Sequence, residues 1–385
     1  MSKIIENFLI PLFVVISVLF AFNSLRAHDS VHLNKLYHHT TDSPVHLEKA
    51  TLSLYFSGDV RVQEYKNGCT EKSCTFFFAH VKINSGECES MVQQLHNYRG
   101  LYAITVQEVM QPSPGLLITF NCDPAYYAVS YEYFDSIGLQ KGIVFRMYNK
   151  ELLNHLENSH NKPILRTLMI PHKAPRIAID PGHGGSDCGA KGCNGVQEKD
   201  ICLAIGTQVG NLLEQQGCSV MLTRNKDYTV GLDERTSYAN SAQADLFVSI
   251  HANYASNQKA MGVETFCLKP SLLKQGYSQL SDEQSQWVHN NLNQRAEMAN
   301  TVAQSVQQHV CNAVAKFHDT SVDRKVKYSV SQVLLGTQMP SLLIEVGFVS
   351  HPKEARLLND NEYQKSIACG ISDGILSAIS SQSFF

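Results

Sequence analysis

The chain has 385 residues, of which 43% are hydrophobic and 17% are charged. This composition is typical of a globular protein, and the length is enough for one large domain or two ordinary ones. The formal net charge of −3 gives no electrostatic reason to expect nucleic acid as a partner.

The N-terminus carries an apolar block from Phe8 to Phe22, interrupted by one proline and one serine and preceded by Lys3. About 15 residues is short for a bilayer span and typical of a signal peptide. We therefore predict a signal peptide over residues 1–27, with Ala27 as the cleavage residue and no transmembrane span afterwards. The expected location is the periplasm or cell envelope, and an uncleaved anchor is the alternative.

Eleven cysteines are many for a cytosolic enzyme of this size and favour an oxidising compartment. Two pairs have the spacing C-x4-C and are close enough for short loop disulfides, namely Cys69/Cys74 and Cys188/Cys193. The pattern leaves the pairing open. Five further cysteines fall on apolar positions and are expected to be small core residues: Cys202, Cys218, Cys267, Cys311 and Cys369.

Residues 28–46 are rich in histidine and polar side chains. No carboxylate or cysteine is spaced to complete a metal site there, so we interpret the segment as a solvated linker rather than a metal-binding tract.

Residues 47–150 are expected to form a small β-rich domain, because short runs of aromatic and β-branched residues alternate with turn signals. The predicted strands are Thr51–Phe56, Thr75–Ile83, Tyr102–Val109, Leu116–Cys122, Tyr126–Tyr133 and Gly142–Tyr148. One helical piece is expected around Cys88–Tyr98. The polar, proline-containing segment 151–175 is predicted to be a second linker.

Residues 176–385 alternate strand and helix patterns. This alternation predicts an α/β fold, with a mainly parallel sheet and helices on both faces. The predicted strands are 176–180, Ser219–Thr223, Asp245–Ile250, Gly262–Leu268, Ser331–Leu335 and Leu342–Val346. The predicted helices are 199–216, Leu232–Gln243, Asp282–Phe317, 352–360 and 361–379.

Four polar residues stand where such a sheet binds ligands. His183, His251 and Glu345 lie at or just beyond the ends of apolar strands, and Glu198 opens a helix. Two histidines and a carboxylate make a zinc site that leaves a position for water. Glu198 suits the role of ligand, which leaves Glu345 as the general base for amide hydrolysis.

The motifs of residues 176–381 also resemble the type-3 family of zinc-dependent N-acetylmuramoyl-L-alanine amidases. Ile-Asp-Pro-Gly-His-Gly-Gly, Asn-Gly-Val-Gln-Glu-Lys-Asp, Ser-Ile-His-Ala-Asn and Leu-Leu-Ile-Glu-Val-Gly-Phe occur in the family's order. The resemblance implies Zn²⁺ bound by His183, Glu198 and His251, with Glu345 catalytic. It implies structural or substrate-positioning roles for Arg224 and Arg235.

The same resemblance implies a peptidoglycan substrate and roles in cell-wall remodelling and daughter-cell separation, and it leaves a divisome activator open. The β-rich half is similar in place and character to the peptidoglycan-binding (AMIN-type) domain of such amidases. Three features depart from the family pattern. Cys188 and Cys193 are extra, His351 stands in place of an asparagine, and the segment Lys269–Asn293 is shorter than the autoinhibitory inserts of division-regulated members.

Three other interpretations compete with this one. A Cys/His hydrolase would use Cys188 or Cys193. An inactive peptidoglycan-binding or scaffold protein would lack a ligand or the base, and the chain has all four. An additional serine-type carboxypeptidase activity would use the S-x-x-K match Ser350-His351-Pro352-Lys353, although Ser350 is better explained as preceding a helix that opens at Pro352.

Overall fold

The computed structural model describes residues 31–40, 48–60, 62–64, 73–83, 103–110, 114–122, 126–135, 141–157, 174–192, 195–278, 280–319 and 322–380. The predicted signal peptide and the helical piece around Cys88–Tyr98 lie outside these residues. Within the described part of the chain, no helix is long and apolar enough to cross a membrane.

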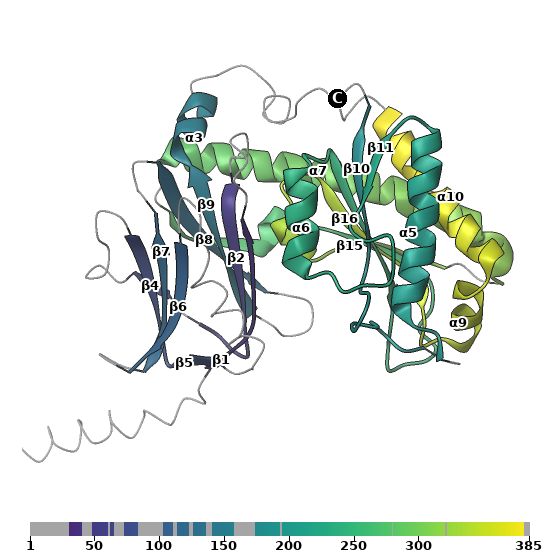
Figure 1. The fold of residues 1–385 in the computed structure, drawn as a ribbon, viewed down its shortest axis with the longest axis horizontal. Helices are drawn as coiled ribbons and strands as arrows, with labels where there is room; N and C mark the ends of the chain where they lie inside the picture. Colours follow the sequence, from purple (N-terminus) through teal and green to yellow (C-terminus); the bar gives the residue numbers. More distant parts are fainter. Residues whose placement is uncertain are drawn as a thin grey trace, which may run out of the picture.

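The N-terminal half is a sandwich of two β-sheets (Figure 1). One sheet has the order β14-β8-β9-β2-β1-β5 and the other β3-β4-β7-β6. The strands are β1 Val31–Thr40, β2 Glu48–Phe56, β3 Val62–Glu64, β4 Ser73–Ala79, β5 Val81–Ile83, β6 Ala103–Val109, β7 Gly115–Asn121, β8 Tyr127–Asp135, β9 Lys141–Asn149 and β14 Leu273–Ser278. The β-rich prediction is confirmed.

Aromatic side chains fill the space between the two sheets. Phe145 of β9 lies 4.9 Å from Phe76 and 5.3 Å from Phe120, measured between ring centroids. All three are essentially inaccessible to solvent. The alternation of inward and outward residues along each strand brings these rings into one core.

Both predicted linkers are wrong in part. Residues 31–40, inside the segment interpreted as a solvated linker, form β1, which pairs with β2 and β5. Leu33 and Leu36 of this strand are fully buried. In the second linker, the segment after β9 begins with a helix, α3 (Lys150–Glu157).

The C-terminal half is built on a sheet of order β11-β10-β12-β16-β13-β15. The strands are β10 Arg176–Pro181, β11 Ser219–Leu222, β12 Leu246–Asn253, β13 Val263–Cys267, β15 Asp323–Tyr328 and β16 Ser341–Phe348. The first four strands in this order are parallel. β13 runs antiparallel to β16, and β15 is parallel to β13. This confirms the predicted α/β fold with a mainly parallel sheet.

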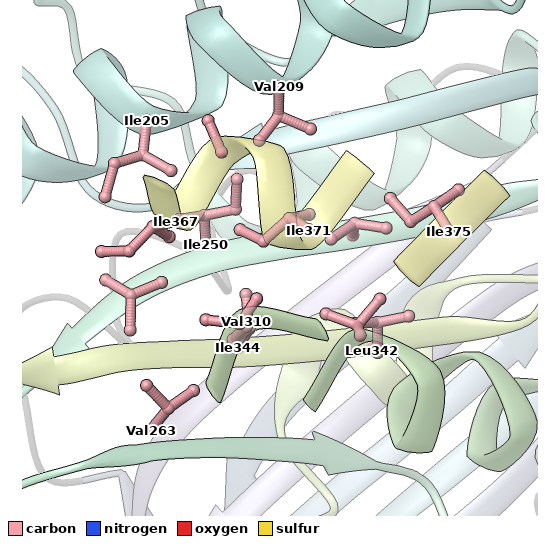
Figure 2. Packing of buried hydrophobic residues seen from close by; sticks show 14 of the residues in the cluster. Ile205, Val209, Ile250, Val263, Val310, Leu342, Ile344, Ile367, Ile371 and Ile375 are labelled. Carbon is pink, nitrogen blue, oxygen red and sulfur yellow. The ribbon is translucent and has the colours of Figure 1, made fainter. Parts of the chain in front are cut away.

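Helices cover both faces of this sheet. The helices are α5 Glu198–Gln215, α6 Leu232–Ser241, α7 Asp282–Val314, α8 Gln332–Gly336, α9 Pro352–Leu358 and α10 Asn361–Ala378, with short 3₁₀ turns at Pro270–Leu272 and Ala315–Phe317. Figure 2 shows the core on one face, where α5, α7 and α10 pack on β12, β13 and β16. α7 and α10 approach closely, since a Cβ at Gly374 would lie 2.6 Å from the Cα of Val306.

One predicted strand is a helix. The apolar run Ser331–Leu335, which the sequence predicts as a strand, forms α8, whose residues are all buried. Together with α6, α8 lies on the face of the sheet opposite α5, where its side chains join the apolar cluster around Phe247.

The two halves share a core. Tyr55, Phe134 and Val144 of the sandwich lie in one apolar cluster with Phe247 and residues of α8. β14, from the C-terminal half, adds to the edge of the N-terminal sheet beside β8. Figure 1 shows α7 extending from α3 to α10 behind both halves.

Polar contacts cross the same boundary. Arg146 of β9 is buried; it donates a hydrogen bond to Glu48 within the sandwich (2.9 Å) and another across the boundary to the carbonyl of Leu335 (3.3 Å). Gln338 donates to the carbonyl of Glu48 at 2.7 Å. The shared apolar cluster and these buried polar contacts make a firm interface rather than a mobile joint.

Candidate active site

The chain leaves β10 through a strained turn. His183 has φ +59°, in the left-handed region that non-glycine residues rarely occupy. The preceding Gly182 lies under the ring of His251, and a Cβ there would come within 2.3 Å of that ring. Only glycine allows the two histidines to come this close.

Two buried arginines hold this turn. Arg224 donates hydrogen bonds to the carbonyls of Pro181 (2.9 Å) and Gly182 (2.8 Å). Arg235 donates to the carbonyls of Pro181 and His183, at 2.7 Å each, and to a carboxylate oxygen of Asp180 at 2.6 Å. Both arginines therefore act on the backbone that presents His183. Of the two roles expected for them, the geometry supports the structural one.

Three of the predicted site residues meet at the carboxyl edge of the sheet. His183 Nε2 lies 3.1 Å from one carboxylate oxygen of Glu198, and His251 Nδ1 lies 2.9 Å from the other. The donor atoms of the three residues all lie within 4.8 Å of one another. The turn after β10, the start of α5 and β12 each contribute one of them.

The surroundings favour the ionised form of Glu198. Burial alone would raise its pKa, but hydrogen bonds and charge interactions with His183 and His251 outweigh burial, so the pKa is lowered. The backbone amides of Ala190 (2.8 Å) and Ala252 (3.0 Å) also donate to this carboxylate. Glu198 thus offers an anionic oxygen to a cation beside both imidazoles.

Asp187 orients His183 from the other side. Its carboxylate lies 2.8 Å from His183 Nδ1, so Nε2 is the ring nitrogen that faces the cluster. Burial lowers the pKa of His183, but the contacts with Glu198 and Asp187 outweigh it and raise the pKa. A carboxylate behind a ligating histidine fixes its tautomer and ring orientation. Sequence reasoning missed Asp187, although its position four residues after His183 in the same loop was a signal.

Glu345 lies opposite His251, on the neighbouring strand β16. Burial raises the pKa of its carboxyl well above the ordinary value, and the nearby charges of Glu198 and Glu264 raise it further. Its Oε2 is buried and makes no hydrogen bond within the described residues. A carboxyl with a raised pKa and an unused oxygen beside the cluster suits proton transfer.

The three-residue cluster fits a zinc ion. Two imidazole nitrogens and one carboxylate are ligands that zinc accepts, and the donor atoms are close enough to share one ion. Glu345 lies on the strand next to that of His251, but it is not one of the three residues whose donor atoms come together. All four residues predicted from the sequence are therefore brought together.

The residues of the two other catalytic interpretations are placed differently. Both ring nitrogens of His183 face carboxylates, and the thiol of Cys188 donates to the carbonyl of Gly189; Cys193 lies outside the described residues. Ser350 is buried and accepts from the amide of Ala255, while Lys353 pairs with Asp319 at 2.8 Å.

His351 has a structural role at the start of a helix. It caps the N-terminus of α9, where its Nδ1 accepts from the amide of Glu354 at 3.3 Å and Pro352 occupies the first turn. This matches the predicted helix start. His351, inside the S-x-x-K match, therefore serves to start α9.

The predicted core cysteines are mostly confirmed. Cys202, Cys218 and Cys267 are buried and Cys311 is half-buried, but Cys369 is exposed on α10, contrary to the prediction.

Fold and site together define an α/β protein with a ligand set suited to a divalent metal ion. A family profile for N-acetylmuramoyl-L-alanine amidase (Amidase_3) matches residues 177–377, and the chain belongs to this family. It is thus an enzyme that hydrolyses the amide bond between N-acetylmuramic acid and L-alanine in peptidoglycan.

Three individual proteins illustrate what the chain is similar to. The chain is 31% identical over 244 residues to N-acetylmuramoyl-L-alanine amidase AmiA of Salmonella typhimurium, covering 59% of this chain and 83% of that protein. It is 36% identical over 205 residues to the uncharacterized protein YqiI of Bacillus subtilis, covering 53% and 85%. A solved N-acetylmuramoyl-L-alanine amidase from Clostridium difficile 630 is 30% identical, with a TM-score of 0.45, covering 55% of this chain and all of that one.

Proposed function

We propose that the enzyme cleaves this amide with Zn²⁺ held by His183, Glu198 and His251, and with Glu345 as the general base. The observation that carries the proposal is the convergence of three donor atoms within 4.8 Å of one another, with Glu345 opposite His251 on the next strand. A bound zinc ion would polarise the scissile carbonyl and make water a stronger nucleophile.

The residues of the chain perform the remaining steps. Asp187 and the two arginines keep the imidazole of His183 in place. Glu345 accepts a proton from the water that attacks the carbonyl carbon, and it returns that proton to the nitrogen of L-alanine as the carbon–nitrogen bond breaks. The products are the lactyl carboxylate of the sugar and a free stem peptide.

Two glutamine substitutions test the separate roles of the two glutamates. Glu345→Gln should retain zinc and lower turnover about 10²–10⁴-fold, because the amide cannot accept the proton. Glu198→Gln should lower the zinc content, because a neutral amide is a poorer ligand. Metal analysis and mass spectrometry of digested peptidoglycan measure both effects. Glu214→Gln, at an exposed position of the same helix, is the matched control.

Loss of zinc from Glu345→Gln together with full zinc in Glu198→Gln would mean that the two carboxylates have exchanged roles. His183→Ala and His251→Ala should each remove the metal. Full occupancy in either variant would contradict the ligand assignment.

We also infer export to the cell envelope through residues 1–27, and a role in wall remodelling and daughter-cell separation. The apolar segment Phe8–Phe22 supports export. The N-terminal residue of protein recovered from the envelope tests it: a chain that still begins at Met1 would contradict cleavage. A filamenting or chaining phenotype in a deletion strain would support the division role, and normal separation would contradict it.

A protein activator and wall binding by the β-rich half are further parts of the proposal. The segment 269–293 forms β14 and the first turns of α7, and it packs on the sandwich. If purified enzyme alone has full activity on isolated walls, no activator is needed. Photo-crosslinking of Glu345→Gln to peptidoglycan should label residues of the sandwich, and labels confined to the catalytic half would contradict wall binding there.

A further inference from the structure

A buried carboxylate stands beside Glu345 and holds two cations. Glu264 of β13 lies opposite Glu345 in the antiparallel pair and is only 4% exposed. One of its oxygens accepts from the side-chain amide of Asn253 at 2.8 Å. The other accepts from Arg324 Nε at 2.7 Å and from Lys327 Nζ. One cation would be enough to neutralise one carboxylate, yet two are present.

A β-bulge brings both cations to this position. Val263 pairs with Asp323 and Thr265 with Val326, so β15 carries one extra residue between these pairs. Lys325, inside the bulge, has φ +71°. In a regular strand, residues 324 and 327 would point to opposite faces of the sheet. The bulge places both on the face of Glu264, and bulges that redirect side chains in this way are frequent beside active sites.

Arg324 and Lys327, here called the β15 cation pair, are held in place but still accessible. Their side chains are 36% and 38% exposed. The guanidinium of Arg324 lies 4.8 Å from the ring centroid of Phe348, a cation–π contact that helps to hold it there.

Other acids leave the pair with a surplus of positive charge. Asp323 pairs with Lys325 and accepts from Gln307 of α7, on the other face of the sheet. Glu354 lies near Arg324, but its carboxylate oxygens accept from backbone amides, and burial raises its pKa to about 7. Among the described residues, Glu264 is therefore the carboxylate that contacts both cations, and its single charge balances one of them.

The pair lies within reach of the reacting amide. His251, Glu345 and Glu264 form a row across β12, β16 and β13. Neighbouring strands are about 4.8 Å apart, so Glu264 lies roughly 10 Å from His251. Arg324 and Lys327 contact Glu264 from the next strand, β15. An extended peptide spans about 3.5 Å per residue, so the second and third residues of a stem peptide cover this distance. On the other side of the metal site, Lys199 is already bonded to Asp227 and to the carbonyl of Gly185.

We propose that Arg324 and Lys327 bind a carboxylate on the second or third residue of the stem peptide, and so determine which peptides the enzyme accepts. This inference rests on the proposed function. Before cleavage, the ionised carboxylates of the substrate lie on the peptide side of the scissile amide, because the lactyl group is itself amidated. A guanidinium and an ammonium side by side are suited to such an anion.

The test uses two pairs of soluble muropeptides and the full-length enzyme loaded with zinc. The two members of the first pair differ at the second peptide residue, whose carboxylate is free in one and amidated in the other. The two members of the second pair differ in the same way at the third residue. The wild-type enzyme should prefer the free member of one pair about tenfold in kcat/KM, mostly through KM. In the Arg324→Gln/Lys327→Gln variant the preference should fall to about one, whereas Arg324→Lys should retain part of it.

Lys325→Gln is the matched control, since this lysine is on the same strand but pairs with Asp323 towards α7. It should keep the full preference. Equal cleavage of free and amidated substrates by the wild-type enzyme would overturn the inference, as would an unchanged preference in the double variant. The wild-type comparison needs no substitution, so a poorly folded variant does not remove the test. Failure to cleave any of the four substrates would instead contradict the proposed function.

Discussion

Asp180→Ala should destabilise the catalytic half strongly. Asp180 is fully buried, and its carboxylate accepts hydrogen bonds from Thr223 (2.6 Å), Ser249 (2.7 Å) and Arg235 (2.6 Å). Its removal leaves the guanidinium of Arg235 buried without an anion, which typically costs about 3–5 kcal/mol. Arg235 keeps its bonds to the carbonyls of Pro181 and His183, so we expect the lower end, about 3 kcal/mol.

Urea unfolding at pH 7, followed by circular dichroism, measures this loss. Asp200→Ala, at an exposed position in the first turn of α5, should cost less than about 1 kcal/mol. A loss below about 1 kcal/mol for Asp180→Ala would refute the reasoning.

The difference between wild type and Asp180→Ala should also depend on pH. The charge of Arg235 and the hydrogen bonds outweigh burial and hold the pKa of Asp180 below its ordinary value of 3.8. A lowered folded-state pKa contributes stability that is complete above the unfolded value and is lost as pH falls towards the folded one. The difference should therefore be constant near neutral pH and shrink below about pH 4.

Two further predictions concern the turn at Gly182 and the carboxyl of Glu354. Gly182→Ala should lower zinc content and activity together, because its Cβ would meet the ring of His251; metal analysis of folded protein checks this, and full zinc with normal activity would contradict it. Burial raises the pKa of Glu354 from 4.5 to about 7, so the folded state retains a proton that the unfolded state loses, and wild-type stability should fall as pH rises from about 4.5 to 7. Glu354→Gln should flatten this part of the pH–stability curve, and an unchanged slope would count against a protonated Glu354.

The residues of the candidate site could be predicted because the end of a strand is recognisable in an α/β sequence. An apolar run followed by a histidine among glycines, or a glutamate within Leu-Leu-Ile-Glu-Val, marks a polar group at a sheet edge. Glu264 lies at the same sheet edge, but at the start of a strand rather than at its end. It stands near the beginning of β13, which is antiparallel to β16 and so starts at the edge where the parallel strands end. Strand direction is not visible in the sequence, so this residue was missed.

Irregular strands explain most of the other errors. β1 has a register shift between Leu33 and Lys35, which hides the alternation expected of a strand. β15 is polar and contains the bulge at Lys325, so no apolar period marks it. The strand prediction for Ser331–Leu335 was wrong for a different reason. A short buried apolar segment has the same sequence pattern whether it forms a strand or a single helical turn.

The N-terminal sheet cannot be completed until β14, a strand from the C-terminal half, has been synthesised. On the edge of β8, Glu132 pairs with Gln275 of β14, which is synthesised roughly 140 residues later. At 5–20 residues per second, synthesis leaves that strand edge without its partner for about 7–30 seconds. An open edge in a strand rich in tyrosine invites pairing with other chains. Until the second half of the chain has been made, the edge of β8 is therefore open to such pairing.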